Sequence, residues 1–355
     1  MPQRLKSLLV QVGSFVLGGG LLWLALRNVD FSALGDALRD ANYWYLLPLA
    51  ALLLGSHGLR AWRWQMLLEA LPDAEGEVRR VPLKTAFYSL MIGYMVNYAA
   101  PRLGEVARTA NLASQSRLPF SGVFGTVVVE RLLDVLVLAL GLVAAFVILA
   151  DRTAVIAPLF APAVDLFADP PVAWWIVIAV GLGVLVGMAV LFRAVLRRSA
   201  RAEGLASRVV ATLQSFRDGL ASVVRAPRRL GIVATTLGIW AAYLLVTFLP
   251  LRMFGIESLG LLDTWVLLMV GTVGMSVPSP GGVGSYHFAT IRTLEVLFGI
   301  ATATATAYAV FSHAAQLVLY TVVGVLCLLL QGTSVRALRA DAARASADAP
   351  ADPSP

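Results

Sequence analysis

Charged side chains interrupt stretches of this sequence that are otherwise apolar. They form three groups: Arg60 and Arg63; Asn97, Arg102, Glu105 and Arg108; and Glu130, Arg131 and Asp134. An ionisable residue inside a membrane segment costs about 2.5–3.5 kcal/mol on insertion scales, so each one is a candidate functional residue. Guanidinium groups suit a phosphate, because their planar forks of N–H donors match its oxygens. These residue types therefore point to recognition of an anion.

Two interpretations of Arg60 and Arg63 stay open. The two arginines lie three residues apart and so share one helix face. They could hold a lipid phosphate, or their side chains could extend to the membrane interface between Trp62 and Trp64. The sequence favours the interface, because the pair lies near the end of an apolar run.

The second group surrounds Pro101 and Gly104, which interrupt an apolar stretch. Arg102 beside opened backbone N–H groups would suit a phosphate, because the helix end also favours anions. The alternative is an internal ion pair between Arg102 and Glu105 that only locks the turn. We favour a binding role for this group.

Glu130 and Asp134 lie four residues apart, which is about one helical turn. Two carboxylates on one face could relay protons or bind a cation. They could equally neutralise Arg102, Arg108 or the Arg60 pair when the helices pack. An acid–base enzyme fits less well because no nucleophile is evident opposite them, and we assign no catalytic residue.

A second break contains Pro278, Pro280, Gly281, Gly282 and Gly284, followed by an expected helix start at residue 285. Its N–H groups could cradle an anion, as glycine-rich turns do at helix N-termini. No Gly-Lys-Ser/Thr follows, so nucleotide binding is unsupported. His287 is a further candidate for the binding site. We expect no metal site and no cofactor.

Composition indicates which elements carry these groups. Of 355 residues, 59% are apolar and 14% are charged, which excludes an ordinary cytosolic enzyme. Apolar runs long enough to span a bilayer occur near 7–27, 43–68, 120–150, 172–192, 230–252 and 302–331. The stretches 83–118 and 261–299 are broken halfway and are predicted to be re-entrant helix pairs. The predicted fold is all-α: a polytopic membrane protein with about six spanning helices and two re-entrant pairs.

The formal net charge of +7 comes from one segment. Residues 193–229 contain nine arginines and two acidic residues, and nine minus two is seven. This pattern argues against nucleic acid and predicts a cytoplasmic segment on anionic inner-leaflet lipid. Both termini are then expected in the cytoplasm of a bacterium, with the chain in the inner membrane.

The order of elements predicts one integral membrane domain over residues 1–335, followed by a disordered cytoplasmic tail over 336–355. Residues 43–150 and 230–331 contain the same order of elements in opposite orientation, which suggests inverted halves. Their breaks share a Pro-x-x-Gly pattern, at Pro101 to Gly104 and at Pro278 to Gly281. Such breaks at matching positions point to a transporter's central site. The oligomeric state stays open.

Four segments, taken in order, resemble the lysylphosphatidylglycerol synthase transmembrane-domain family. They are Leu59-Arg-Ala-Trp-Arg-Trp-Gln-Met-Leu-Leu68, Gly93 to Arg108, Glu130-Arg-Leu-Leu-Asp134 and Pro280-Gly-Gly-Val-Gly284. The resemblance covers about residues 10–330. The matching positions are Arg60, Arg63, Asn97, Pro101, Arg102, Gly104, Glu105, Arg108, Glu130, Arg131, Asp134, Pro280, Gly281, Gly282 and Gly284. His287 departs from the family, which often has a glutamate there, so a different substrate, such as an anionic one, is expected.

In the best-known members such a domain precedes a soluble aminoacyl-transferase domain and moves the lipid product between leaflets. No such domain follows in this sequence, so the resemblance implies translocation and not synthesis. We expect a phospholipid or lipid-linked headgroup to cross through a polar cavity between the two breaks. The alternatives are an accessory subunit that presents lipid to a separate glycosyl- or aminoacyl-transferase, and an intramembrane enzyme using Glu130, Asp134 and His287.

Overall fold

The computed structural model describes residues 16–69, 80–99, 103–116, 118–150, 228–277 and 279–332. Those up to Ile148, and those from Arg228 onward, belong to one compact unit. Within these ranges the chain is helical and contains no strand, which confirms the all-α class. The predicted span at 172–192, most of the basic segment 193–229, the tail 336–355, and Pro101, Arg102 and Pro278 lie outside the described residues.

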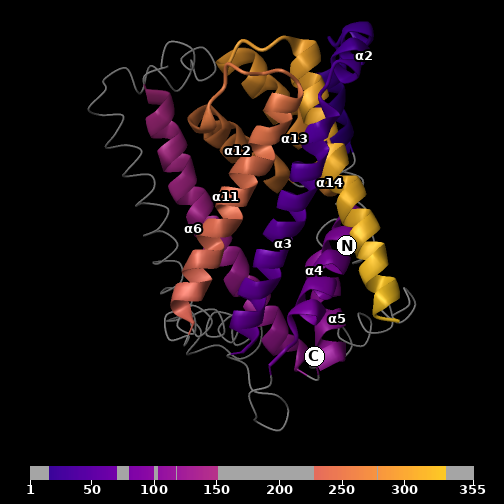
Figure 1. The fold of residues 1–355 in the computed structure, drawn as a ribbon, viewed down its shortest axis with the longest axis vertical. Helices are drawn as coiled ribbons and strands as arrows, with labels where there is room; N and C mark the ends of the chain where they lie inside the picture. Colours follow the sequence, from indigo (N-terminus) through magenta and orange to yellow (C-terminus); the bar gives the residue numbers. More distant parts are fainter. Residues whose placement is uncertain are drawn as a thin grey trace, which may run out of the picture. The chain divides into compact units, whose positions relative to one another are not determined.

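Apart from α2, which no predicted apolar run contains, the described helices follow one another in the order predicted from the apolar runs (Figure 1). After a helix at Val16–Leu26 come α2 (Phe31–Arg39), η1 (Tyr43–Tyr45), α3 (Leu46–Leu68), α4 (Leu83–Ala99), α5 (Gly104–Ser116), α6 (Phe120–Leu149), α11 (Arg229–Met253), α12 (Leu261–Ser276), η5 (Pro280–Gly282), α13 (Ser285–Arg292), the π-helical turn η6 (Thr293–Leu297) and α14 (Thr302–Leu330). Helix α13 begins at residue 285, as expected.

Three of the described helices, α6, α11 and α14, are long and apolar enough to cross a membrane. Their outward faces carry apolar side chains, for example Leu140 of α6, which is 64% exposed, and Leu329 of α14, which is 68% exposed. Lipid tails, and not water, suit such surfaces. Helix α3 has 23 residues but also buries polar side chains along its second half.

Each of the two broken stretches folds as a pair of short helices, α4 with α5 and α12 with α13, and the partners pack against each other. The pairs lie toward opposite ends of α3 and α11, which pack side by side (Figure 1). In the first pair the backbone of Gly104 contacts the backbone of Gly93, leaving no room for a Cβ atom. In the second, Gly281 has a φ of 58°, in the left-handed region that favours glycine. The predicted breaks at glycine are therefore confirmed.

Helices from the two halves of the sequence pack against each other at glycines. Gly324 of α14 lies against Met91 and Met95 of α4, and a Cβ atom on it would come within 2.6 Å of the Met95 Cβ. Gly141 of α6 lies against Trp265 of α12, whose indole N–H donates to the Gly141 carbonyl at 3.0 Å. Small residues allow helix backbones in a membrane to approach closely.

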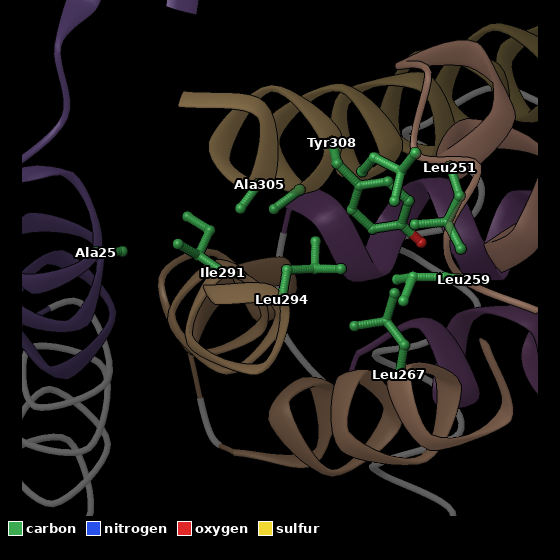
Figure 2. Close-up of a cluster of buried hydrophobic side chains, with 10 residues drawn as sticks. Ala25, Leu251, Leu259, Leu267, Ile291, Leu294, Ala305 and Tyr308 are labelled. Atoms are coloured by element: carbon green, nitrogen blue, oxygen red, sulfur yellow. The ribbon is translucent and has the colours of Figure 1, made fainter. Parts of the chain in front are cut away.

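A buried apolar cluster supports the second broken pair. Figure 2 shows Ile291 of α13 and Leu294 of η6 between Ala305 of α14 and Leu267 of α12. Tyr308 belongs to the same cluster, and its hydroxyl donates to the Thr247 carbonyl at 2.8 Å. The cluster thus fixes the short helix α13 against α11, α12 and α14.

Candidate functional site

Arg60 and Arg63 of α3, Arg108 of α5, and Glu130 and Asp134 of α6 meet in one buried group, here called the arginine cluster. Arg63 Nη2 lies 2.8 Å from Asp134 Oδ1, and Arg108 Nη1 lies 3.1 Å from Glu130 Oε2. Arg60 Nη2 pairs with the other Asp134 oxygen. Three helices thus supply one network of charges.

The expectation that Arg60 and Arg63 extend to the membrane interface is wrong. Their side chains are 5% and 0% exposed, and of the two neighbouring tryptophans only Trp62 is exposed. Trp64 is buried and donates through Nε1 to Thr126 at 2.9 Å. The two arginines can be buried because α6 brings carboxylates to them, a partnership that their place near a helix end does not reveal.

Glu130 and Asp134 neutralise arginines, as the pairing alternative expected. Glu130 has no exposed side-chain surface, and its Oε1 lies 3.5 Å from Arg63 Nη2 and 3.7 Å from Arg60 Nη2. The observed partners are Arg60, Arg63, Arg108 and, at 3.8 Å, Arg131. Both carboxylates are therefore engaged with guanidinium groups.

Positive charge exceeds negative charge in the arginine cluster. Its members are three buried guanidinium groups, the buried Glu130 carboxylate and the Asp134 carboxylate, which is 14% exposed. Arg131 adds a fourth guanidinium that is 41% exposed, and Glu105 adds a third carboxylate 4.0 Å from it. Each addition cancels the other, so an excess of one positive charge remains among the described residues.

Several donors in this cluster have no hydrogen-bond partner within the described part of the chain. They are Nε of Arg60, Nε of Arg63, Nη2 of Arg108 and Nε of the adjoining Arg131, and one acceptor, Glu130 Oε1, also lacks a hydrogen bond. A buried donor without a partner costs about 1–3 kcal/mol, and more when it is charged. Unused donors next to surplus positive charge are the features that an anion such as a phosphate would satisfy.

Asn97 has a structural role at the first break. Its Oδ1 accepts a hydrogen bond from the backbone N–H of Gly104 at 2.8 Å, at the start of α5. An orphan N–H at a helix start is satisfied in this way by a side-chain acceptor. The internal pair between Arg102 and Glu105 stays a prediction, because Arg102 is not described.

His287 lies apart from these charges, among aromatic rings at the second break. Its Nδ1 accepts from the Gly284 N–H at 3.3 Å, and its ring centroid lies 5.0 Å from that of His313. The His313 ring also lies 5.5 Å from Tyr286 and 5.9 Å from Tyr98 of α4. The second break is thus lined by rings without fixed charge.

Sequence reasoning missed the uncharged partners of the arginines. Arg60 donates to the Tyr94 hydroxyl, Arg63 donates to Thr236 Oγ1 at 3.1 Å, and the Tyr243 ring lies 5.9 Å from the Arg60 guanidinium carbon. Tyrosine and threonine are common in apolar helices, so their residue type gave no signal. Only their position opposite Arg60 and Arg63 distinguishes them.

The fold and this cluster define an all-helical membrane protein with buried, partly paired arginines. The chain belongs to the family of the lysylphosphatidylglycerol synthase TM region, whose sequence profile matches residues 11–324. It is also similar to the glycosyltransferase AglD of Haloferax volcanii, with 27% identity over 326 residues, 83% of this chain and 50% of that protein. The chain thus spans about half the length of this curated relative. No solved structure matches it.

Proposed function

We propose that this protein moves a phospholipid or lipid-linked headgroup across the bacterial inner membrane, with both of its termini in the cytoplasm. Membership in a membrane-lipid family supports a lipid as the substrate. The observation that carries the proposal is the arginine cluster, with three buried guanidinium groups against two carboxylates. The lipid phosphate binds there.

The energetics favour a bound phosphate. A buried charge without a partner is costly, and the surplus guanidinium is buried beside apolar helices. A phosphate supplies both the missing negative charge and acceptors for the unpaired Arg108 Nη2 and the Nε atoms of Arg60 and Arg63. Arg108 also lies over the Trp64 ring at 5.0 Å, which fixes its guanidinium plane.

The broken helix pairs supply the route. Opened backbone at membrane depth is tolerated where protein or a wet cavity satisfies it, and such breaks mark central sites in transporters. Gly104 and Gly281 allow the two breaks to form. The headgroup passes between these breaks while its acyl chains stay against the apolar outer faces.

A second candidate function is an accessory subunit that presents lipid to a separate transferase. The observation that favours it is the relative named a glycosyltransferase, of which this chain matches 50%. The same phosphate site would serve either role. The two differ in whether the purified chain moves lipid alone.

A vesicle assay tests the proposal. The full chain is reconstituted into phosphatidylglycerol-containing vesicles with an acyl-labelled fluorescent phospholipid, and exchange is followed by quenching of the outer leaflet. We expect the protein to accelerate exchange and Arg108→Ala to slow it at least tenfold. Arg39→Ala is the matched control, because that arginine is 83% exposed and pairs only with Asp36 among the residues described.

The variants are checked for folding by thermal unfolding, and Arg108→Lys retains the charge without the planar fork. No acceleration by the wild-type protein, or equal rates for Arg108→Ala and the wild type, would overturn translocation through this site. Copurification with a transferase together with no exchange by the chain alone would favour the accessory role.

A further inference from the structure

A continuous series of rings joins the arginine cluster to the second break. The series, here called the aromatic track, comprises His57, Tyr94, Tyr320, Tyr98, His313, His287 and Tyr286. His57 lies 4.5 Å from Tyr94 and 4.6 Å from Tyr320, and Tyr320 lies 6.2 Å from Tyr98, centroid to centroid. Tyr98 then reaches His313 at 5.9 Å. The track draws on α3, α4, α13 and α14.

Both ends of the track are anchored to features of the proposed site. At one end Arg60 donates to the Tyr94 hydroxyl. At the other, His287 Nδ1 accepts from the Gly284 N–H of the second break, and the break also packs on the middle of the track, because a Cβ atom on Gly281 would lie 2.9 Å from Tyr98 Cδ1. A group bound at the arginines is therefore adjacent to the first rings.

Buried polar atoms on the track lack hydrogen-bond partners. Both ring nitrogens of His57, which is 1% exposed, and Nε2 of His313, which is 5% exposed, have none within the described part of the chain. Most buried side-chain polar atoms in proteins have a partner, so such exceptions call for an explanation. A ligand with its own donors and acceptors would supply the missing partners.

Charge restricts the class of ligand. The track residues include neither a carboxylate nor an arginine or lysine, and neither His57 nor His313 forms an ion pair with a described residue. With the phosphate bound the arginine cluster is neutral, so a cationic headgroup on the track would be buried without a carboxylate to pair with. An uncharged headgroup with hydroxyls needs no such partner, and its C–H groups pack against ring faces.

We propose that the aromatic track binds an uncharged, hydroxyl-bearing headgroup, a glycerol or a sugar, attached to the phosphate held by the arginine cluster. This inference rests on the proposed function, because the two sites share one lipid. His57 and His313 donate to, or accept from, the headgroup hydroxyls. The tyrosine rings between them provide its packing surface.

Lipid retention by the purified full chain, measured by native mass spectrometry, tests the inference. The probes are phosphatidylglycerol, phosphatidylmethanol, a glycosylated polyprenyl phosphate and lysylphosphatidylglycerol. Phosphatidylmethanol has the same phosphate diester and charge as phosphatidylglycerol but no headgroup hydroxyl. The variants His57→Phe and His313→Phe retain a ring and remove the nitrogens. Tyr88→Phe is the matched control, because among the described residues its ring pairs with Phe87 and with no ring of the track.

We expect the wild type to retain phosphatidylglycerol or the glycosyl lipid about three- to tenfold better than phosphatidylmethanol, the ratio that one or two lost hydrogen bonds imply. The histidine variants should lose this preference while still binding phosphatidylmethanol, and Tyr88→Phe should keep it. If only His57→Phe loses the preference for phosphatidylglycerol over phosphatidylmethanol, the headgroup is a glycerol. If both variants lose the preference for the glycosyl lipid over phosphatidylmethanol, the headgroup is a sugar that reaches His313.

Equal retention of phosphatidylmethanol and both hydroxyl lipids by the wild type, or preferred retention of lysylphosphatidylglycerol, would overturn the inference. So would an unchanged preference in both histidine variants that unfold at the wild-type temperature. Failure of the proposed phosphate site has a different signature: Arg108→Ala would then bind phosphatidylmethanol as the wild type does.

Discussion

Arg108 of α5 donates a hydrogen bond to Glu130 of α6 at 3.1 Å, with the two side chains 3% and 0% exposed. The same carboxylate lies 3.5 Å from Arg63 and 3.7 Å from Arg60 of α3. The buried Glu130 carboxylate thus forms ion pairs with guanidinium groups from two other helices. Charge at this point holds α3, α5 and α6 together.

Glu130→Gln should destabilise the protein by about 3–5 kcal/mol, because it removes one partner of a buried ion network. The amide keeps the shape of the side chain but leaves three buried arginines facing Asp134 alone. Thermal unfolding in detergent measures the change. Glu257→Gln is the control, since Glu257 lies exposed in the loop before α12, and an equal shift for both variants would contradict the prediction.

Double-mutant cycles should give a larger coupling energy for the buried pair Arg63 and Asp134 than for the exposed pair Arg39 and Asp36. The first pair is 2.8 Å apart with exposures of 0% and 14%, and the second is 3.6 Å apart with exposures of 83% and 69%. Alanine substitutions should give a coupling energy of about 1–3 kcal/mol for the first pair and under about 0.5 kcal/mol for the second. Similar coupling in the two pairs would show that burial does not strengthen this interaction.

Gly104→Ala should destabilise the protein by at least about 1–3 kcal/mol, because the added methyl meets the backbone carbonyl of Gly93, which cannot rotate away. Gly125→Ala is the matched control in α6, where nothing lies within 4 Å of the new Cβ. That variant should be neutral or gain up to about 1 kcal/mol from helix propensity. Unfolding temperatures of the two variants test this order, and Gly104→Ala at or above the wild type would refute it.

His57→Phe should leave the unfolding temperature unchanged or raise it, although it weakens binding of hydroxyl-bearing lipids. The substitution removes two buried nitrogens that have no partner in the described residues, and replacing unpaired polar atoms by apolar ones of similar shape is neutral or favourable. His57→Ala, which opens a cavity between Tyr94 and Tyr320, should lower the temperature. A larger fall for phenylalanine than for alanine would show that the nitrogens stabilise the fold.

The sequence allowed the helix boundaries and both breaks to be predicted, because glycine and proline act locally. Gly104 and Gly281 mark the breaks in the sequence and occupy them in the structure. The packing of Gly324 of α14 against Met95 of α4 could not be predicted in this way. It depends on which helices become neighbours, which no local pattern specifies.

The candidate site was predicted by residue type but not by environment. Arg60 and Arg63 were identified as charged residues in an apolar run, yet their burial depends on Asp134, which lies more than seventy positions further along the chain. The tyrosines of the aromatic track and His57 were not predicted, because tyrosines such as Tyr98 are ordinary residues of apolar helices. The track's significance comes only from the approach of α4 and α14.

The distance along the chain between Arg63 and Asp134 affects how the protein is made. Asp134 follows Arg63 by 71 residues and Arg60 by 74, so the ribosome delivers the cations of α3 well before their anions. At about 5–20 residues per second the delay is roughly 4–15 seconds. During it, α3 carries two arginines that each cost about 2.5–3.5 kcal/mol in lipid. We therefore expect α3 to gain its buried position only once α6 has supplied Glu130 and Asp134 as partners.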